Sequence, residues 1–244
     1  VEVTYVADER YAATKRPPKY LGFTIFHEDE QLVIVDKPAA WLTVPSPKRE
    51  SNTLVQRIAE YLTRRNRGRP VHVWAVQRLD RGVSGVIVMA RENEAAAALR
   101  QAFAAHEPDR EYVAIVAGVM KADSGTFRSK LDSGDDLKQR SVGDDEQGQM
   151  SITHFQVTRR WDDATLVRVR LETGRRNQIR VHFAEAGHPV LGDKIYEPAK
   201  AEHPRWPYKR LALHAERLGF DHPITGERLD FTAPLPVEFD EFMR

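Results

Sequence analysis

One stretch of the chain combines a carboxylate with cations and small residues in a pattern that could support catalysis. Asp80 stands between Arg78 and Arg81 in VQRLDRGVSGVIVMAR, residues 76–91. Glycines and a serine follow at once, and then an apolar run, Val86–Ala90. The pattern predicts a tight loop that presents one carboxylate and then enters a buried strand. Nearby arginines favour the ionised form, so Asp80 suits a nucleophile or a base better than a general acid.

The alternative for this stretch is structural, because most Arg-Leu-Asp triplets are turns with a surface ion pair. Other catalytic motifs are missing from the sequence: it has no P-loop, no dinucleotide glycine fingerprint and no HExxH motif. There is no cysteine, and His182, His188 and His214 lie near apolar segments, so we interpret them as core or hydrogen-bonding histidines. We therefore expect no metal and no cofactor, and any chemistry must depend on a carboxylate and arginines.

Composition limits the class of protein. The 244 residues are 41% hydrophobic and 30% charged, with a net charge of +1, which fits a globular protein with a substantial core. No apolar run reaches the length of a membrane span, and the first residues, VEVTYVADER, lack the features of a signal peptide. We expect a cytoplasmic monomer that is not associated with a membrane.

Positive charge is concentrated in two places. RRNRGR at 64–69 has four arginines and no acid, and residues 168–182 have five arginines and one glutamate. A nearly neutral protein can bind a polyanion through such local patches. The alternative is that these arginines are simply solvated.

The order of the remaining elements predicts a mixed α+β fold. Residues 1–22 are expected to form an extended N-terminal arm or linker, and residues 23–244 one domain. Apolar spacing predicts helices over 51–65, 92–106 and 178–186, and strands over 32–35, 86–90, 111–118, 151–159, 165–171, 211–220 and 228–231. Residues 123–151 are expected to be mainly loop, and 233–242 a tail punctuated by prolines. Hairpin signals predominate, which indicates an antiparallel-rich central sheet flanked by helices and loops.

Several segments together resemble the RluA-type RNA pseudouridine synthases. They are IFHEDEQLVIVDKPAAWLTVP, VQRLDRGVSGVIVMAR, REYVAIVAG, TGRRNQIRVHFAEAGHPVLGDKIY and the closing LALHAERLGFDHPITGERLDFTAPLP. Their order and spacing agree with that family over residues 24–240. The resemblance implies the pseudouridine synthase fold, with a central active-site cleft and with residues 23–244 as the catalytic domain.

The family's reaction and site residues follow from the resemblance. It implies isomerisation of a specific uridine in ribosomal and/or transfer RNA to pseudouridine, with base flipping and without a cofactor. Asp80 would be the catalytic aspartate, Tyr112 the active-site tyrosine and Arg180 the partner of the aspartate. Arg78 would occupy the space left by the extruded base, and Leu213 would pack against the pocket. The further arginines expected to contact RNA, mostly at phosphates, are Arg81, Arg175, Arg176, Arg64, Arg65, Arg67 and Arg69.

The chain departs from the family pattern at a few positions. Gln77 stands where the family usually has histidine, Arg176 and Asn177 replace a Thr-His pair, and Ala40 replaces a glycine. None of these changes affects Asp80, Tyr112 or Arg180, but they bear on which RNA is accepted. Two alternatives remain: an RNA-binding protein that keeps the fold without catalysis, and a glycosidase, which would usually need a second catalytic carboxylate.

Overall fold

The computed structural model describes residues 22–46, 52–133, 138–143 and 145–244, so the expected N-terminal arm lies almost wholly outside the described residues. The strands are β1 (Thr24–Glu28), β2 (Leu32–Lys37), β3 (Trp74–Ala75), β4 (Ser84–Ala90), β5 (Asp109–Ala117), β6 (Ser124–Ser133), β7 (Gln139–Val142), β8 (Gln149–Arg160), β9 (Ala164–Leu171), β10 (Leu213–Asp221) and β11 (Arg228–Thr232). The helices are α1 (Leu54–Arg65), α2 (Asn93–Ala104), α3 (Gln178–Glu185), α4 (Pro198–Ala201) and α5 (Val237–Met243). No helix in these ranges is long and apolar enough to span a membrane.

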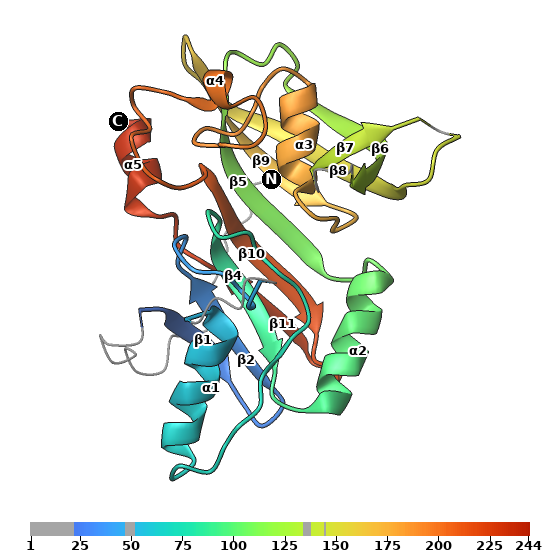
Figure 1. Ribbon diagram of the computed structural model, residues 1–244, viewed down its shortest axis with the longest axis vertical. Helices are drawn as coiled ribbons and strands as arrows, with labels where there is room; N and C mark the ends of the chain where they lie inside the picture. The colour runs from blue at the N-terminus through green and yellow to red at the C-terminus, as the bar shows by residue number, and fades with distance from the viewer. Residues whose placement is uncertain (1–21, 47–51, 134–137, 144) are drawn as a thin grey trace, which may run out of the picture.

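The strands form one long sheet in the order β1-β2-β4-β10-β5-β9-β8-β6-β7 (Figure 1). β11 pairs with β10, and β3 pairs with β4, outside this path. Among the described strands, neighbours are antiparallel except β4 and β10, which run parallel. The sheet therefore joins an N-terminal set of strands to a C-terminal set at the β4–β10 pair.

The two faces of the central strands are covered by different helices. On one face, the apolar side of α1 (Leu54, Ile58 and Leu62) belongs to the same buried cluster as Ile87 of β4 and Phe183 of α3. On the other face, α2 and β11 cover a second cluster that includes Val86 and Val88 of β4. Every residue of β4 is buried, which is typical of a strand covered on both faces.

The parallel pair brings two backbones unusually close at Gly85. Gly85 has φ +120, and a Cβ built on it would lie 2.1 Å from the carbonyl oxygen of Ala215. Next to it, the side chains of Ser84 and His214 are 2.8 Å apart, and Arg210 Nη2 donates to Ser84 Oγ at 2.6 Å. Only glycine fits this crossing, and it lies directly after the loop that contains Asp80.

The predicted fold class is confirmed: the domain is mixed α+β with a large, mostly antiparallel sheet. Two local expectations are wrong. Residues 123–151 contain the long strand β6, the strand β7 and the start of β8, and the tail contains α5. β6 is largely exposed and lacks an apolar period, yet it is held by continuous pairing with β8 from Ser124 to Leu131. α5 starts after Pro236 and buries Phe239 and Phe242, three residues apart on one face.

The close crossing at Gly85 predicts a large stability difference between two glycine substitutions. Gly85→Ala forces an overlap with backbone atoms as well as an unfavourable φ, so we expect a loss of about 3 kcal/mol or more in the free energy of unfolding. Gly226→Ala is the matched control, because Gly226 also has positive φ but nothing lies within 4 Å of its built Cβ. We expect it to cost about 1 kcal/mol. Equal losses in urea denaturation would contradict the role assigned to the crossing.

Candidate active site

The loop that presents Asp80 is fixed by its backbone. Thr43 Oγ1 donates to the carbonyl of Leu79 at 2.8 Å, and the N–H of Leu79 donates back to Thr43 Oγ1 at 3.1 Å. The N–H of Val83 donates to the carbonyl of Asp80 at 3.0 Å, which closes a turn. The N–H of Leu211 donates to the carbonyl of Gly82 at 3.1 Å. The carboxylate therefore projects from a loop that is attached both to the segment after β2 and to the segment before β10.

Arg180 is the cation that binds this carboxylate. Its Nη1 donates to Asp80 Oδ2 at 2.8 Å, while Nε and Nη2 donate to the two carboxylate oxygens of Asp193 at 2.7 and 2.9 Å. Arg180 is buried, and the Asp193 side chain is fully buried, whereas the Asp80 side chain is 34% exposed. Burial alone would lower the pKa of Arg180, but the hydrogen bonds and charges of the two aspartates outweigh it and raise that pKa.

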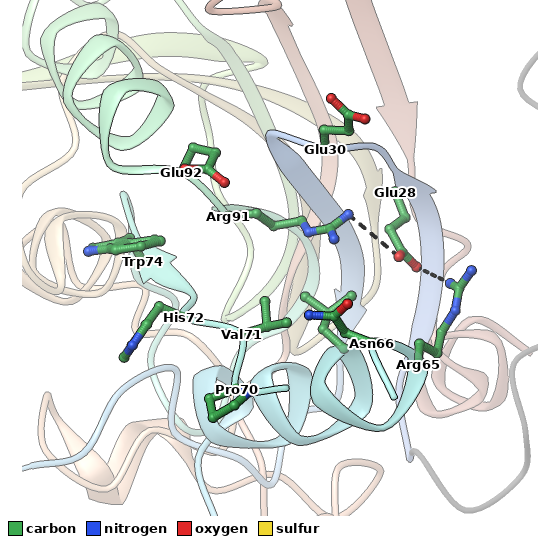
Figure 2. A pocket seen from close by; sticks show the side chains of 11 residues that line it. Glu28, Glu30, Arg65, Asn66, Pro70, Val71, His72, Trp74, Arg91 and Glu92 are labelled. Atoms are coloured by element: carbon green, nitrogen blue, oxygen red, sulfur yellow. Dashed lines mark hydrogen bonds and ion pairs between the residues drawn. The ribbon is translucent and has the colours of Figure 1, made fainter. Parts of the chain in front are cut away.

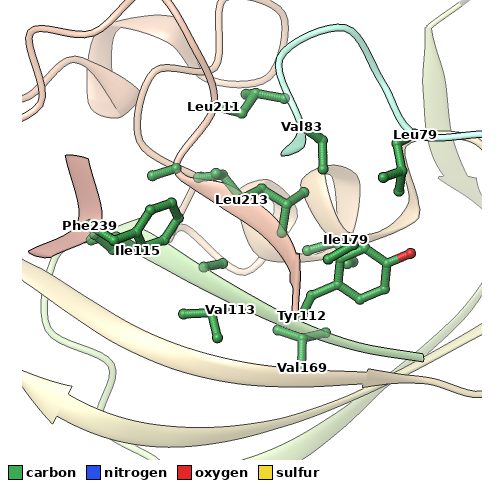
Figure 3. Close-up of a cluster of buried hydrophobic side chains, with 14 of the residues drawn as sticks. Leu79, Val83, Tyr112, Val113, Ile115, Val169, Ile179, Leu211, Leu213 and Phe239 are labelled. Carbon is green, nitrogen blue, oxygen red and sulfur yellow. The ribbon is translucent and has the colours of Figure 1, made fainter. Parts of the chain in front are cut away.

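Tyr112 forms the apolar wall beside the carboxylate. It lies on β5, between β9 and β10, and is 8% exposed. Figure 3 shows its ring packed with Val169, Ile179 and Leu213, with the hydroxyl at the edge of this cluster. Burial raises the pKa of the Tyr112 phenol; the charge of Arg110 opposes this shift and the charge of Asp80 adds to it. The phenol is therefore neutral at ordinary pH, and its hydroxyl can donate a hydrogen bond.

A small pocket brings these groups together. Twelve residues line it: Arg78, Leu79, Asp80, Val83, Tyr112, Leu171, Arg175, Asn177, Gln178, Ile179, Arg180 and Leu213. They come from the Asp80 loop, from β5, from the end of β9, from α3 and its preceding turn, and from the start of β10. One carboxylate, one flat apolar wall and several cations suit a planar, uncharged ring attached to an anionic backbone. The pocket can support nucleophilic or base chemistry by Asp80.

Six of the expected site residues line this pocket: Asp80, Tyr112, Arg180, Arg78, Arg175 and Leu213. Arg81 and Arg176 are exposed near the pocket but do not line it. Of the two arginines that flank Asp80 in the sequence, Arg78 is exposed, and the arginine that contacts the carboxylate is Arg180. The ion pair of Asp80 is made by the distant Arg180, which is the partner that the family resemblance implied.

The arginines of 64–69 lie elsewhere, at the C-terminal end of α1 and in the turn that follows. Figure 2 shows a separate pocket there, between α1, the β1–β2 hairpin and the segment Pro70–Trp74. Arg65 Nη1 lies 2.5 Å from Glu28 Oε2, and Arg91 lies 3.6 Å from the same carboxylate. Arg64, Arg67 and Arg69 are exposed. None of these arginines lines the pocket that contains Asp80.

Two charged residues of the site were missed by sequence reasoning. Asp193, in the Gly-Asp-Lys of the arginine segment, supplies the second carboxylate to Arg180. Lys37 is fully buried, and its Nζ donates to the carbonyls of Pro38 and Trp41 at 3.0 and 2.7 Å. Burial lowers the pKa of Lys37 to about 7, although the charge of Asp80 opposes the shift. The sequence offered little indication of either role: Asp193 is an acidic residue directly after Gly192, and Lys37 is a lysine at the end of an apolar strand.

The histidines behave as expected. His214 is fully buried beside Ser84, and burial lowers its pKa to about 4. His182 on α3 is buried between Thr153 and Ser129, and burial lowers its pKa to about 4 as well. Among the described residues, no group of histidine and acidic side chains is arranged to hold a metal ion. His182 and His214 are therefore neutral members of the packed interior at ordinary pH.

Comparison with known proteins shows the family of the chain. A family model described as RNA pseudouridylate synthase matches residues 31–185. Ribosomal large subunit pseudouridine synthase D of Zymomonas mobilis is 34% identical over 91% of this chain and 72% of its own length. The dual-specificity RNA pseudouridine synthase RluA of Pasteurella multocida is 35% identical over 89% of this chain and 95% of its own length. These levels of similarity establish a common family.

A solved structure shares the fold. Human RNA pseudouridylate synthase domain containing 4 superimposes with a TM-score of 0.72, covering 90% of this chain and 91% of the human chain, at 24% identity. The chain belongs to the RNA pseudouridylate synthase family. Within that family its relatives place it in the RluA group, whose members are isomerases that convert uridine in RNA to pseudouridine.

The two carboxylates of Arg180 predict unequal effects on stability. Asp193→Asn leaves a buried guanidinium without its bidentate anion, and we expect a loss of about 3 kcal/mol in the free energy of unfolding. Asp80→Asn removes a partly exposed charge from the same arginine and should cost about 1 kcal/mol or less. Urea denaturation of both variants measures the difference. If Asp193→Asn were no less stable than Asp80→Asn, the anchoring role of Asp193 would be wrong.

Proposed function

We propose that this RluA-type synthase isomerises a specific uridine in ribosomal and/or transfer RNA, with Asp80 as the catalytic residue. The observation that carries the proposal is the placement of the Asp80 carboxylate in a pocket, paired with Arg180 at 2.8 Å and beside the ring of Tyr112. The relative named as a ribosomal large subunit synthase supports ribosomal RNA as a substrate, and the relative named as a dual-specificity RNA synthase supports more than one kind of target.

The reaction requires the uracil to leave its stack, because an enzyme cannot reach the reacting atoms of a base that remains stacked between its neighbours. The flipped uracil would lie against the ring of Tyr112 and Leu213, and Arg78 would take the place of the base in the helix. Arg175 would meet the phosphate backbone at the edge of the pocket. The target uridine is thereby separated from its neighbours before any bond breaks.

Asp80 then acts on the sugar by one of two routes. As a nucleophile it bonds to C1′ while the glycosidic C–N bond breaks, and the released uracil later displaces it through C5. As a base it removes a sugar hydrogen from C2′, and the proton returns after the C–C bond forms. In both routes the uracil leaves as an N1 anion, rotates within the pocket and bonds to C1′ through C5. C5 then loses its proton and N1 gains one, so the overall reaction is an isomerisation. Arg180 orients the Asp80 carboxylate through a charge-assisted hydrogen bond, and Tyr112 can take part in the proton transfer from C5.

We further propose that residues 23–244 form the catalytic domain and that the protein acts as a cytoplasmic monomer on its RNA. A single chain supplies Asp80, Tyr112 and Arg180 around one pocket, so the chemistry proposed for Asp80 requires no residue from a second copy. The alternative is an RNA-binding protein without catalysis, which predicts that no uridine is converted. A test for pseudouridine formation therefore distinguishes the enzyme from this alternative.

Asp80→Asn should abolish pseudouridine formation and leave RNA binding intact, because the amide keeps the shape of the side chain without its nucleophilicity or basicity. The measurement is chemical mapping of pseudouridine in total RNA from cells that lack the endogenous enzyme, after incubation with the wild type or the variant. A new site with the wild type alone establishes the activity and identifies the uridine. RNA binding with no new site for either protein would support the non-catalytic alternative.

The basic residues at the end of α1 predict a salt-dependent contribution to binding. If Arg64 and Arg67 each meet a phosphate, replacing both by alanine should weaken RNA binding and reduce the slope of log affinity against log salt by about 2, without changing the modified uridine. Arg100→Ala is the control, because Arg100 is exposed on α2, which covers the opposite face. The test is to measure RNA affinity at several salt concentrations. An unchanged slope in the double variant would show that Arg64 and Arg67 do not contact RNA phosphates.

A further inference from the structure

Asn177 has an unusual backbone conformation at the edge of the active site. It is the residue immediately before α3 and has φ 55 and ψ 14, in the left-handed region. Asparagine, aspartate and glycine adopt this conformation more easily than other residues. The side chain of Asn177 lines the pocket and lies one helical turn before Arg180. The conformation thus directs a short polar side chain toward the Asp80–Arg180 pair.

The amide of Asn177 connects Arg180 to Tyr196. Its Oδ1 accepts from Arg180 Nη1 at 3.1 Å, and its Nδ2 donates to Tyr196 Oη at 3.1 Å. Tyr196 is buried, and its ring lies beneath the guanidinium of Arg180, with 5.1 Å from Cζ to the ring centre. The same hydroxyl accepts the backbone N–H of Gln139 at 3.1 Å. Each of these three residues, Arg180, Asn177 and Tyr196, therefore contacts the other two.

These contacts leave the guanidinium little freedom to rotate. Of its five N–H donors, two serve Asp193, and the two on Nη1 are divided between Asp80 and Asn177. Rotation of Arg180 away from Asp80 would break the bond to the amide as well. The amide thus fixes the nitrogen that holds the catalytic carboxylate.

Asn177 is the third side chain that accepts a hydrogen bond from Arg180, and unlike Asp80 and Asp193 it cannot carry a negative charge. Arg180 already faces two carboxylates, so its single positive charge is exceeded by the charge of Asp80 and Asp193. A third anion at position 177 would compete with Asp80 for Nη1 and repel it. An amide supplies the acceptor without that competition, and it also donates to Tyr196, which a carboxylate cannot do.

We propose that Asn177 is a positioning residue for the isomerisation, whose neutral amide divides the donors of Arg180 so that Asp80 is held in its reactive orientation. The inference rests on the proposed function, because it assigns Asn177 a role in the chemistry of Asp80. Asn177 acts through Arg180, and nothing in the argument requires it to touch the reacting atoms.

Two substitutions that suit the left-handed backbone test this role. Asn177→Gly keeps the turn and removes the amide, and Asn177→Asp keeps the size and adds the competing charge. With the RNA identified by the mapping above, we expect kcat to fall about tenfold or more for each, with KM changed by less than about threefold. Tyr196→Phe keeps the ring beneath Arg180 and removes only the hydroxyl, so we expect a smaller loss. Combining it with Asn177→Gly should add little, because the hydroxyl acts through the amide.

The outcomes separate the possible failures. Thermal unfolding of each variant shows whether the fold is kept, and the glycine variant remains informative if the aspartate variant is unstable. A wild-type kcat for Asn177→Gly would mean that asparagine serves only the backbone turn, and a wild-type kcat for Asn177→Asp would refute the argument from charge. Either result overturns the inference while leaving the proposed function in place. Absence of pseudouridine formation by the wild type itself overturns the proposed function and this inference with it.

Discussion

The burial of the Arg180 cation is the constraint on which the site depends. A charge removed from water must be paired and hydrogen-bonded, and one carboxylate rarely satisfies a guanidinium with five donors. Here Asp193 takes one edge of the guanidinium and Asp80 accepts from the other. The loop before β4, the helix α3 and the segment after it must therefore converge on one point. Because both partners raise its pKa, Arg180 remains charged, and the carboxylate of Asp80 keeps its partner throughout the ordinary pH range.

Local patterns in the sequence were sufficient for much of the fold. The apolar run after Asp80 is the buried strand β4, and the predicted helix over 51–65 is α1, which begins after Thr53. The alternation over 165–171 marks β9, whose Arg168 is exposed while Val167 and Val169 are buried. β6 could not be predicted in the same way, because its polar side chains are exposed and its stability comes from pairing with β8. For α5, prolines suggested a tail, although a proline is well tolerated just before a helix.

The residues of the site also differ in how far the sequence could predict them. Asp80, Tyr112 and Arg180 were named from the order of several segments, and the structure places all three around one pocket. Asp193 and Lys37 could not be predicted from the sequence. The pairing of Asp193 with Arg180 and the burial of the Lys37 amine both result from tertiary contacts. The loop sequence alone pointed to Arg78 and Arg81 as the cations near Asp80, whereas the hydrogen bond to its carboxylate comes from Arg180. Neighbours in an extended loop point in different directions, and the contact is made by a residue 100 positions away.

The parallel pairing of β4 with β10 has a consequence for how the protein folds. It joins Ser84 to His214, a separation of 130 residues, and the loop that presents Asp80 is attached to Leu211 just before the same strand. Closing so long a loop is slow compared with forming the hairpins and helices on either side. We infer that β10 joins the sheet late, because its other neighbour, β5, is also about 100 residues away in the sequence, with Leu213 opposite Ala114. The pocket would then form together with the completed sheet, so that no partly folded chain could present the carboxylate in its final surroundings.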